Sequence, residues 1–386
     1  MQFDSAFEMA TSRIRFGAGT TREVGWDLVD LGVRRALVVV DPVVARLPPA
    51  DALRESLLAA GVECDWYDRV RVEPSEASFQ EAIAVANAGR YDGFVALGGG
   101  STIDTAKVAN LYSTYPADFL TYVNAPLGQA RPIPGPLKPL IAIPTTAGTG
   151  SETTGVAICD LKEKRIKTGI AHRLLKPTLG ILDPDNTRTQ PAQVAASTGL
   201  DVLCHALESY TASPYCERPR PEKPSLRPNY QGSNPISDVW VERSLAMVAE
   251  HLPRAYADTS DDEARSAMLL AAAYAGIGFG NAGVHLCHAI SYPIASLVRD
   301  YHAPDYPDDH PLVPHGISVV LTAPAVFRFT APSSPARHLR AAGLLGADTR
   351  GASEEDAAEL LAQRLVQLFR GLGVPDGLAA VGYSPA

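Results

Sequence analysis

Apolar and polar positions change their period about halfway along the chain. Before residue 187, short continuous apolar runs alternate with stretches in which apolar residues recur every three or four positions. Such runs indicate buried parallel strands, and the stretches between them indicate helices. The predicted strands are 35–40, 62–67, 93–97, 139–144 and 179–184, and the predicted helices are 50–60, 79–88 and 102–111. We therefore expect a Rossmann-like α/β domain, in which helices cover both faces of a parallel sheet.

Beyond residue 187 the helical period dominates. The predicted helices are 192–212, 238–256, 261–275, 284–298, 317–327, 336–345 and 354–372. The sequence thus predicts two domains, an α/β domain over 1–187 and an all-α domain over 188–386.

The helix predicted over 192–212 carries the most informative polar pattern. Asp201 and His205 are four residues apart and share one helix face, with Glu208 on the same stripe. A carboxylate and an imidazole on one face can bind a divalent metal. They can equally form a buried pair that only packs, so the pattern alone leaves both interpretations open.

Histidines cluster further along the chain. Five of the nine fall between His285 and His315, with His288 on a predicted helix and His315 in a turn that enters another helix. One aspartate and three histidines give a four-ligand set that leaves room for a substrate oxygen. Asp201, His205, His288 and His315 are thus candidate ligands for Fe(II) or Zn(II), between which ligand type does not choose.

Glycines follow the third predicted strand of the α/β domain. Gly98, Gly99, Gly100 and Ser101 lie between that strand and a predicted helix, whose first turn contains Asp104. Glycines in this context let the backbone and the helix N–H groups approach a phosphate.

Asp41 ends the first predicted strand. At that position it can accept hydrogen bonds from an adenosine ribose, which favours NAD over NADP, or it can simply form a turn before Pro42.

These motifs resemble those of a known family. The chain resembles the iron-containing alcohol dehydrogenase family in its metal-ligand pattern, which here consists of Asp201-xxx-His205, His288 and Pro314-His315-Gly316. The stretches 230–238 and 278–288 resemble the hydroxyacid–oxoacid transhydrogenase branch. The resemblance covers nearly the whole chain. It implies the fold shared with dehydroquinate synthase, with an NAD-binding α/β domain and a helical metal-binding domain.

The resemblance also implies NAD as cofactor and assigns its contacts. Family members use the threonines of a string like 145–152, a lysine placed as Lys167, and residues placed as Leu182 and Pro184 beside the nicotinamide. A plain turn and a solvated lysine are the alternatives. The implied cofactor residues are Asp41, Gly98, Gly99, Gly100, Ser101, Asp104, Thr145, Thr146, Thr149, Lys167, Leu182 and Pro184.

The implied reaction is metal-assisted hydride transfer through bound NAD. In this branch, 4-hydroxybutyrate is oxidised to succinate semialdehyde and 2-oxoglutarate is reduced to 2-hydroxyglutarate. Many family members have a histidine four residues after the ligand that matches His288, where this chain has Tyr292. Tyr292 and His285 are the candidate catalytic proton relays.

Three other functions remain open at this point. The first is an NAD-dependent alcohol dehydrogenase that acts on a small alcohol or hydroxyacid and releases NADH. The second is a dehydroquinate-synthase-like lyase, and the third is a non-catalytic nucleotide-binding protein. The family pattern at the four candidate metal ligands favours an oxidoreductase.

Composition restricts the partners. A net charge of −9 and the absence of a long apolar run disfavour nucleic acid and membrane partners. We expect a homo-oligomer, a dimer, with small-molecule hydroxyacid and oxoacid substrates. The five cysteines show no C-x-x-C spacing and the early residues are acidic, so we expect a cytoplasmic location.

Two long segments interrupt the helices of the second domain. The first, 213–235, contains Arg218, Arg220, Lys223 and Arg227, and the second, 299–314, begins with Arg299. Long segments without regular structure are often functional. Our hypothesis is that they supply a cation to an acidic substrate. Family members usually continue beyond the equivalent of Ala386, so we expect a shortened C-terminus.

Overall fold

The computed structural model describes residues 2–306, 308 and 310–384. Internal contacts divide the chain into two compact units. The α/β unit comprises Thr11–Thr146 and Gly150–Thr189. The helical unit comprises the segment that ends at Ala10, then Ala147–Thr149, and the chain from Gln190 onward. The boundary expected after residue 187 stays a prediction.

The α/β unit contains a six-stranded parallel sheet. Its strand order is β1-β8-β5-β4-β2-β3. The strands are β1 (Arg13–Phe16), β2 (Arg35–Val40), β3 (Glu63–Tyr67), β4 (Gly93–Gly98), β5 (Leu140–Pro144) and β8 (Leu179–Leu182). The predicted parallel sheet is confirmed, but β1 was not predicted. This short edge strand alternates arginine with apolar residues and therefore contains no continuous apolar run.

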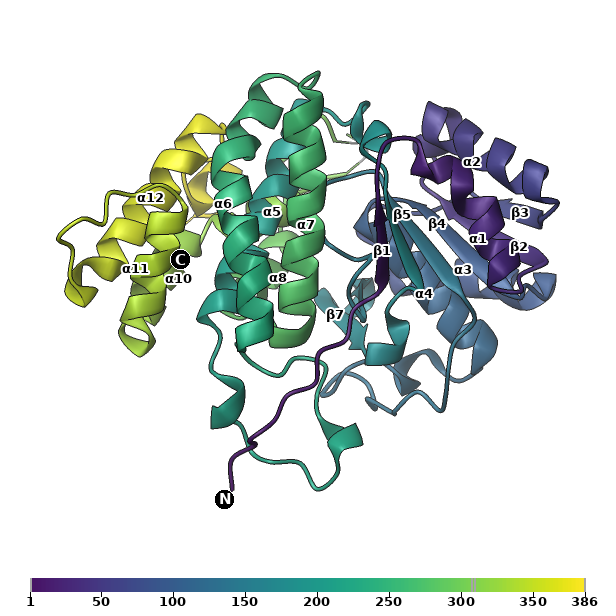
Figure 1. Cartoon of the computed structure of the whole chain (residues 1–386), viewed down its shortest axis with the longest axis horizontal. Coiled ribbons are helices and arrows are strands. Elements are labelled where there is room, and N and C mark those ends of the chain that lie inside the picture. Colours follow the sequence, from purple (N-terminus) through teal and green to yellow (C-terminus); the bar gives the residue numbers. More distant parts are fainter. Residues whose placement is uncertain (1, 307, 309, 385–386) are drawn as a thin grey trace. The chain divides into compact units, whose positions relative to one another are not determined.

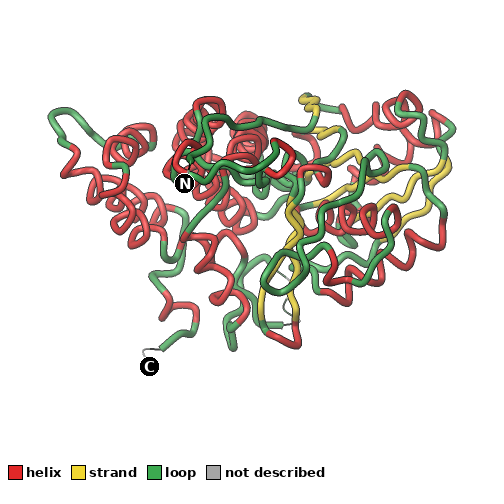
Figure 2. The backbone as a smooth tube through the Cα atoms, turned by 90° about the horizontal axis from the view of Figure 1, so that it is seen from below, coloured by secondary structure: helices red, strands yellow, loops and turns green. Residues whose placement is uncertain are grey.

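Helices cover both faces of this sheet, as predicted (Figure 2). Val38 and Val40 of β2 pack with helices α1 and α2, whereas Leu37 and Val39 pack with α3 and α4. Both faces of β2 are thus buried, which explains its continuous apolar run. The helices are α1 (Val24–Asp30), α2 (Pro48–Ala60), α3 (Glu76–Gly89) and α4 (Gly100–Thr114).

The α/β unit also contains an antiparallel pair that was not predicted. Strand β6 (Val156–Leu161) pairs with β7 (Ile166–Ala171). These strands and the turn between them contain many charged residues, so their sequence is typical of a solvent-exposed segment. Side chains of β6 nevertheless alternate between buried and half-buried positions, as expected for a strand with one covered face.

The helical unit is built around three long helices. The first, α5 (Ala192–Thr211), packs against α6 (Pro235–Ala257) and α7 (Asp262–Ala282), and the three lie side by side in Figure 1. The remaining helices are α8 (Leu286–Ser296), α9 (His315–Val320), α10 (Ala323–Thr330), α11 (Pro335–Leu344) and α12 (Ala357–Gly371).

Two helices differ from the sequence prediction. The helix predicted over 317–327 is divided into α9 and α10. Pro324 lies in the first turn of α10, and proline has no backbone N–H with which to continue α9. The end of α7 lies seven residues beyond the predicted end, at Ala282 rather than Ala275. Gly278 serves packing there, because a Cβ on it would lie only 2.2 Å from Val241 of α6.

Among the described residues, no single helix has the length and apolar composition needed to cross a membrane. Helices α7 and α8 meet that criterion only as a pair, and they are bent by 103° relative to each other.

A buried ammonium group fixes the segment that follows β5. Lys107 of α4 is fully buried and donates to Ser151 Oγ at 2.6 Å and to the Val156 carbonyl at 2.8 Å. The Ser151 hydroxyl in turn donates to Asp104 Oδ1, which lies 3.7 Å from the ammonium. Burial lowers the pKa of Lys107 to about 8, although Asp104 and Glu152 act in the opposite direction.

We expect Lys107→Met to destabilise the α/β unit by about 3 kcal/mol, because it leaves the carboxylate of Asp104 without its cation. Urea unfolding followed by circular dichroism measures this change. Lys164→Met, at an exposed position, is the matched control and should behave like the parent. Equal stability of the two variants would contradict this role of Lys107.

Candidate active site

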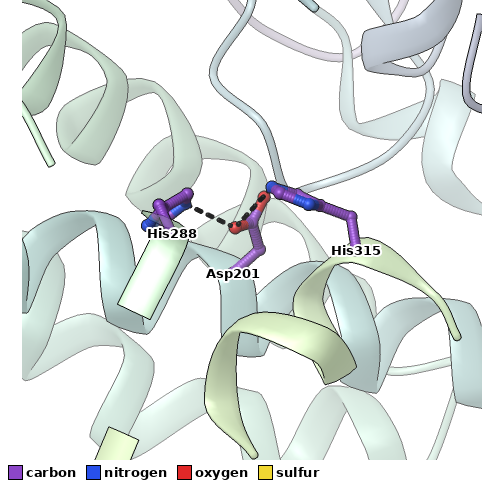
Figure 3. A group of neighbouring side chains, drawn as sticks. All are labelled: Asp201, His288 and His315. Carbon is purple, nitrogen blue, oxygen red and sulfur yellow. Dashed lines mark ion pairs between the residues drawn. The ribbon is translucent and has the colours of Figure 1, made fainter. Parts of the chain in front are cut away.

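Three candidate ligands from three helices converge in the helical unit. Asp201 of α5, His288 of α8 and His315 of α9 point toward one another (Figure 3). One ligand atom of each lies within 4.8 Å of the others. Asp201 Oδ1 is 3.3 Å from His288 Nε2 and 3.7 Å from His315 Nε2. The structure thus brings together residues that are up to 114 positions apart in the sequence.

Two of these atoms lack a hydrogen bond. Asp201 Oδ1 and His288 Nε2 are buried and have no hydrogen-bond partner among the described residues. Buried polar atoms are normally paired, so two unpaired atoms that face each other need an explanation. A divalent cation held by a carboxylate and imidazoles fits this arrangement. The neighbouring histidines outweigh burial and hold the pKa of Asp201 below its ordinary value, so the carboxylate is charged.

His205 lies beside this group, with Nε2 3.6 Å from Asp201 Oδ1. Its ring is stacked between Phe279 of α7, at a centroid distance of 3.9 Å, and His288, at 4.5 Å. Burial lowers the pKa of His205 to about 3, although Asp201 acts in the opposite direction. No role was predicted for Phe279, whose ring fixes the plane of this imidazole.

Glu208 organises the start of α8. Its Oε1 accepts the backbone N–H groups of His285 at 3.0 Å and Cys287 at 2.8 Å, while Oε2 contacts His288 Nδ1. The Glu208 side chain is fully buried. Burial alone would lower the pKa of His288, but Glu208 and Asp201 outweigh burial and raise it to about 10. A carboxylate on the second nitrogen of a metal-binding histidine is a common way to orient the ring.

The two candidate proton relays have different surroundings. His285 Nδ1 accepts the N–H of Leu286 at 2.8 Å, and Nε2 lies 2.9 Å from Thr211 Oγ1. Both of its ring nitrogens therefore contact protein groups. Tyr292 is half-buried on α8, one helical turn after His288. The catalytic role of either residue stays a prediction.

A glycine determines how closely α9 approaches α5. A Cβ on Gly316 would lie 1.8 Å from the carbonyl oxygen of Ser197. Only glycine therefore allows this approach, which holds His315 beside Asp201. The sequence contains the signal for this constraint in its Pro314-His315-Gly316 string.

In the α/β unit, three of the candidate cofactor residues lie at the carboxyl ends of neighbouring strands. Asp41, Gly98 and Thr145 directly follow or end β2, β4 and β5, whose carboxyl ends meet because the strands are parallel. From β2 the chain goes to β3 on one side and later to β4 on the other. Ligands of open α/β sheets bind at such a reversal of strand order.

The glycine turn is tightly packed. A Cβ on Gly98 would lie 2.4 Å from Thr102 Oγ1, and one on Gly99 would lie 3.2 Å from Thr146 Oγ1. Thr145 donates its N–H to the Gly98 carbonyl at 3.1 Å. The turn formed by Gly98 and Gly99 therefore lies next to Thr145 and Thr146. Helix α4 begins beside this turn with Gly100 and Ser101.

Several cofactor candidates contact protein groups. Asp41 Oδ1 accepts the N–H groups of Val43 and Val44. These bonds form the turn that the sequence allows as an alternative to ribose binding. Lys167 lies 3.0 Å from Glu73 Oε2 and 3.1 Å from Asp160 Oδ1. Burial acts to lower the pKa of Lys167, but the two carboxylates outweigh burial and raise it.

The other candidates lie in varied settings. Asp104 belongs to the network of Lys107, and Ser101 Oγ accepts the N–H of Glu73. Leu182 is buried at the end of β8, and Pro184 begins a short 3₁₀ turn. Thr149 belongs to the helical unit. The cofactor role of each candidate stays a prediction.

Two cations proposed for an acidic substrate contact the protein itself. Arg218 and Arg227 lie 3.0 Å and 2.9 Å from Asp4 Oδ2. The hypothesis therefore loses two of its five candidates. Residues 307 and 309 of the second segment lie outside the described residues.

Comparison with known sequences identifies the relatives. Residues 11–184 match the family "Iron-containing alcohol dehydrogenase", and residues 230–385 match "Fe-containing alcohol dehydrogenase family, C-terminal". The chain is 58% identical to "Hydroxyacid-oxoacid transhydrogenase, mitochondrial" of Bos taurus, over 99% of this chain and 83% of that protein. The human protein of the same name is 57% identical over 99% of this chain and 82% of its own length.

The names of these relatives overturn one prediction. The expected cytoplasmic location is wrong, because the relatives are named as mitochondrial proteins. The prediction relied on unpaired cysteines and on the composition of the early residues. Unpaired cysteines indicate a reducing compartment, but they do not identify which one.

Solved structures agree with this classification. The chain resembles 1,3-propanediol oxidoreductase with a TM-score of 0.85 and 27% identity, over 98% of this chain and 90% of that one. An archaeal alcohol dehydrogenase from a Red Sea brine pool gives a TM-score of 0.84 and 26% identity, over 100% and 90% of the two chains. The metal-ligand geometry, the fold and the sequence relatives lead to one conclusion: this chain belongs to the iron-containing alcohol dehydrogenase family.

Proposed function

We propose that this chain is a hydroxyacid–oxoacid transhydrogenase, an oxidoreductase that moves hydride between two substrates through one bound NAD. The observation that carries the proposal is the match to transhydrogenases along almost the whole chain. We propose 4-hydroxybutyrate as hydride donor and 2-oxoglutarate as acceptor. Succinate semialdehyde and 2-hydroxyglutarate are then the products.

The family uses iron and NAD, in agreement with the cofactors predicted from the sequence. When bound, the iron polarises the substrate hydroxyl oxygen, and NAD accepts the hydride and returns it to the second substrate. Asp201, His205, His288 and His315 are the proposed iron ligands. Their convergence within the helical unit supports this assignment.

The remaining residues of the site orient a metal ligand, bind the cofactor or move a proton. Glu208 holds the His288 ring through Nδ1, so that Nε2 faces Asp201. With NAD bound, the glycine turn at the start of α4 would let the backbone approach the cofactor phosphates. Asp41 would accept from the adenosine ribose through the oxygen that does not bond Val43 and Val44. Tyr292 and His285 are our two candidates for moving the hydroxyl proton.

We further propose that the chain functions as two domains that are divided after residue 187, with residues 2–10 bound to the helical one, and as a homodimer without nucleic-acid or membrane partners. The net charge of −9 supports the absence of polyanionic partners.

Transhydrogenation can be tested without added cofactor. We expect anaerobically purified protein, supplied with Fe(II), to convert 4-hydroxybutyrate and 2-oxoglutarate into equimolar products over many turnovers. Both products are quantified by chromatography. Asp201→Asn should abolish the exchange, while Asp258→Asn, at an exposed position, should not change it. Products formed only with added NAD, together with NADH in solution, would contradict the proposal and indicate a conventional dehydrogenase.

We expect Glu208→Gln to weaken metal binding by about tenfold, because an outer carboxylate that orients a ligand typically has an effect of this size or larger. The measurement is competition for Zn(II) with a chromophoric chelator. Glu242→Gln is the matched control, since Glu242 bonds Tyr210 and Arg340 rather than a candidate ligand. Unchanged affinity in the Glu208 variant would exclude this orienting role.

Gly316→Ala should weaken Zn(II) binding by about tenfold or more, because the added Cβ forces α9 and His315 away from Ser197. Gly371→Ala, where a Cβ meets no atom within 4 Å, is the matched control. The same chelator competition compares the two variants. If both bound Zn(II) as the parent does, the close approach of α9 would not determine the position of His315.

A further inference from the structure

The two sequence stretches typical of the transhydrogenase branch lie against each other. Gln231 donates its N–H to the Asn281 carbonyl at 2.7 Å, and Gly232 donates to the Ala282 carbonyl at 2.9 Å. Stretch 230–238 is thereby fixed to the last turn of α7. No step of the proposed reaction uses Gln231 or Asn281, although both side chains are buried.

Both side chains bind the N-terminal segment. Gln231 accepts the Glu8 N–H at 2.9 Å and donates to the Glu8 carbonyl at 2.7 Å. Asn281 makes the same pair of bonds with Ala10, at 3.0 Å and 2.9 Å. Residues 8 and 10 of an extended chain present their backbone polar groups on one side. The side-chain amides of Gln231 and Asn281 therefore bond to them as a neighbouring strand would. We name Gln2–Ala10 the N-terminal strap.

The other end of the strap is held by charge. Asp4 is buried and accepts from Arg227 Nε at 2.9 Å and from an Arg218 guanidinium nitrogen at 3.0 Å. Its backbone N–H donates to the Arg218 carbonyl at 2.9 Å. The Phe7 ring packs against Tyr215 with a centroid distance of 4.8 Å. In Figure 1 the purple strap runs beside the teal segment that contains these partners.

The last turn of α7 connects the strap to the candidate metal ligands. Asn281 of this turn binds Ala10, while Phe279 of the same turn stacks on His205. Gly283 then donates its N–H to the Phe279 carbonyl at 2.7 Å and leads directly into His285 and α8. A movement of this turn would therefore displace His205 and His288 together.

We infer that the N-terminal strap is a positioning element of the metal site. By fixing Gln231 and Asn281, it holds the end of α7 and thus the spacing between His205 and His288. This inference rests on the proposed metal ligands. It does not depend on which hydroxyacid or oxoacid reacts.

The test removes backbone donors of the strap without changing a residue of the metal site. Glu8→Pro and Ala10→Pro each delete one N–H that Gln231 or Asn281 accepts. Met9→Pro is the matched control, because no hydrogen bond from the Met9 N–H occurs among the described residues. We expect the double variant Glu8→Pro/Ala10→Pro to bind Zn(II) about tenfold more weakly than the parent, and the control to match the parent.

Two further measurements make the result decisive. NADH binding to the double variant, followed by fluorescence, should stay unchanged, since all of its proposed contacts except Thr149 lie in the α/β unit. If the double variant does not fold, Asp4→Asn replaces it, and a smaller loss of Zn(II) affinity is expected. Parent-like Zn(II) affinity in the double variant would overturn the inference, and faster proteolysis of 213–235 would show that the strap had been released without effect on the metal.

The outcome is separable from that of the proposed function. If the parent binds Zn(II), weaker binding by the double variant supports the inference even when no transhydrogenation is observed. Conversely, full transhydrogenation by the parent with unchanged Zn(II) affinity in the double variant sustains the proposed function and refutes the role of the strap.

Discussion

The buried carboxylate of Glu208 is the interaction on which the helical site depends. One oxygen satisfies backbone N–H groups at the start of α8, and the other contacts the ring of His288. A helix start leaves such N–H groups unpaired, and an anion placed there is favoured by the helix dipole. The same group therefore stabilises α8 and sets the direction of a candidate ligand. Without this pairing, a buried charge and several buried donors would each be unsatisfied.

Close backbone packing is the second constraint. Gly316 brings α9 against α5, and Gly278 brings α7 against α6, at distances that no other residue type allows. Three helices from distant parts of the sequence can therefore place Asp201, His288 and His315 in one small volume. Rigid packing of this kind suits a metal site, whose ligands need fixed positions before the metal binds.

The sequence predicted the sheet and the proximity of Asp201 and His205 because each leaves a local signal. Buried strands appear as apolar runs, and the spacing of Asp201 and His205 places both on one helix face. It did not predict the role of Phe279 on α7, whose ring stacks on His205 of α5. Nor did it predict the engagement of Lys167 by Glu73, 94 residues away. Such contacts arise from tertiary packing between segments whose own patterns are those of ordinary helices and loops.

The strap also has a consequence for the order of events during synthesis. Glu8 is separated by 223 residues from Gln231, and Ala10 by 271 residues from Asn281. Residues 2–10 leave the ribosome before the α/β unit does, but they obtain these partners only after the entire α/β unit has been made. Closing so long a chain is slow, because its entropy must be lost before the contacts form. The strap thus completes the helical unit late, and until then Asn281 of α7 lacks its two hydrogen bonds to Ala10.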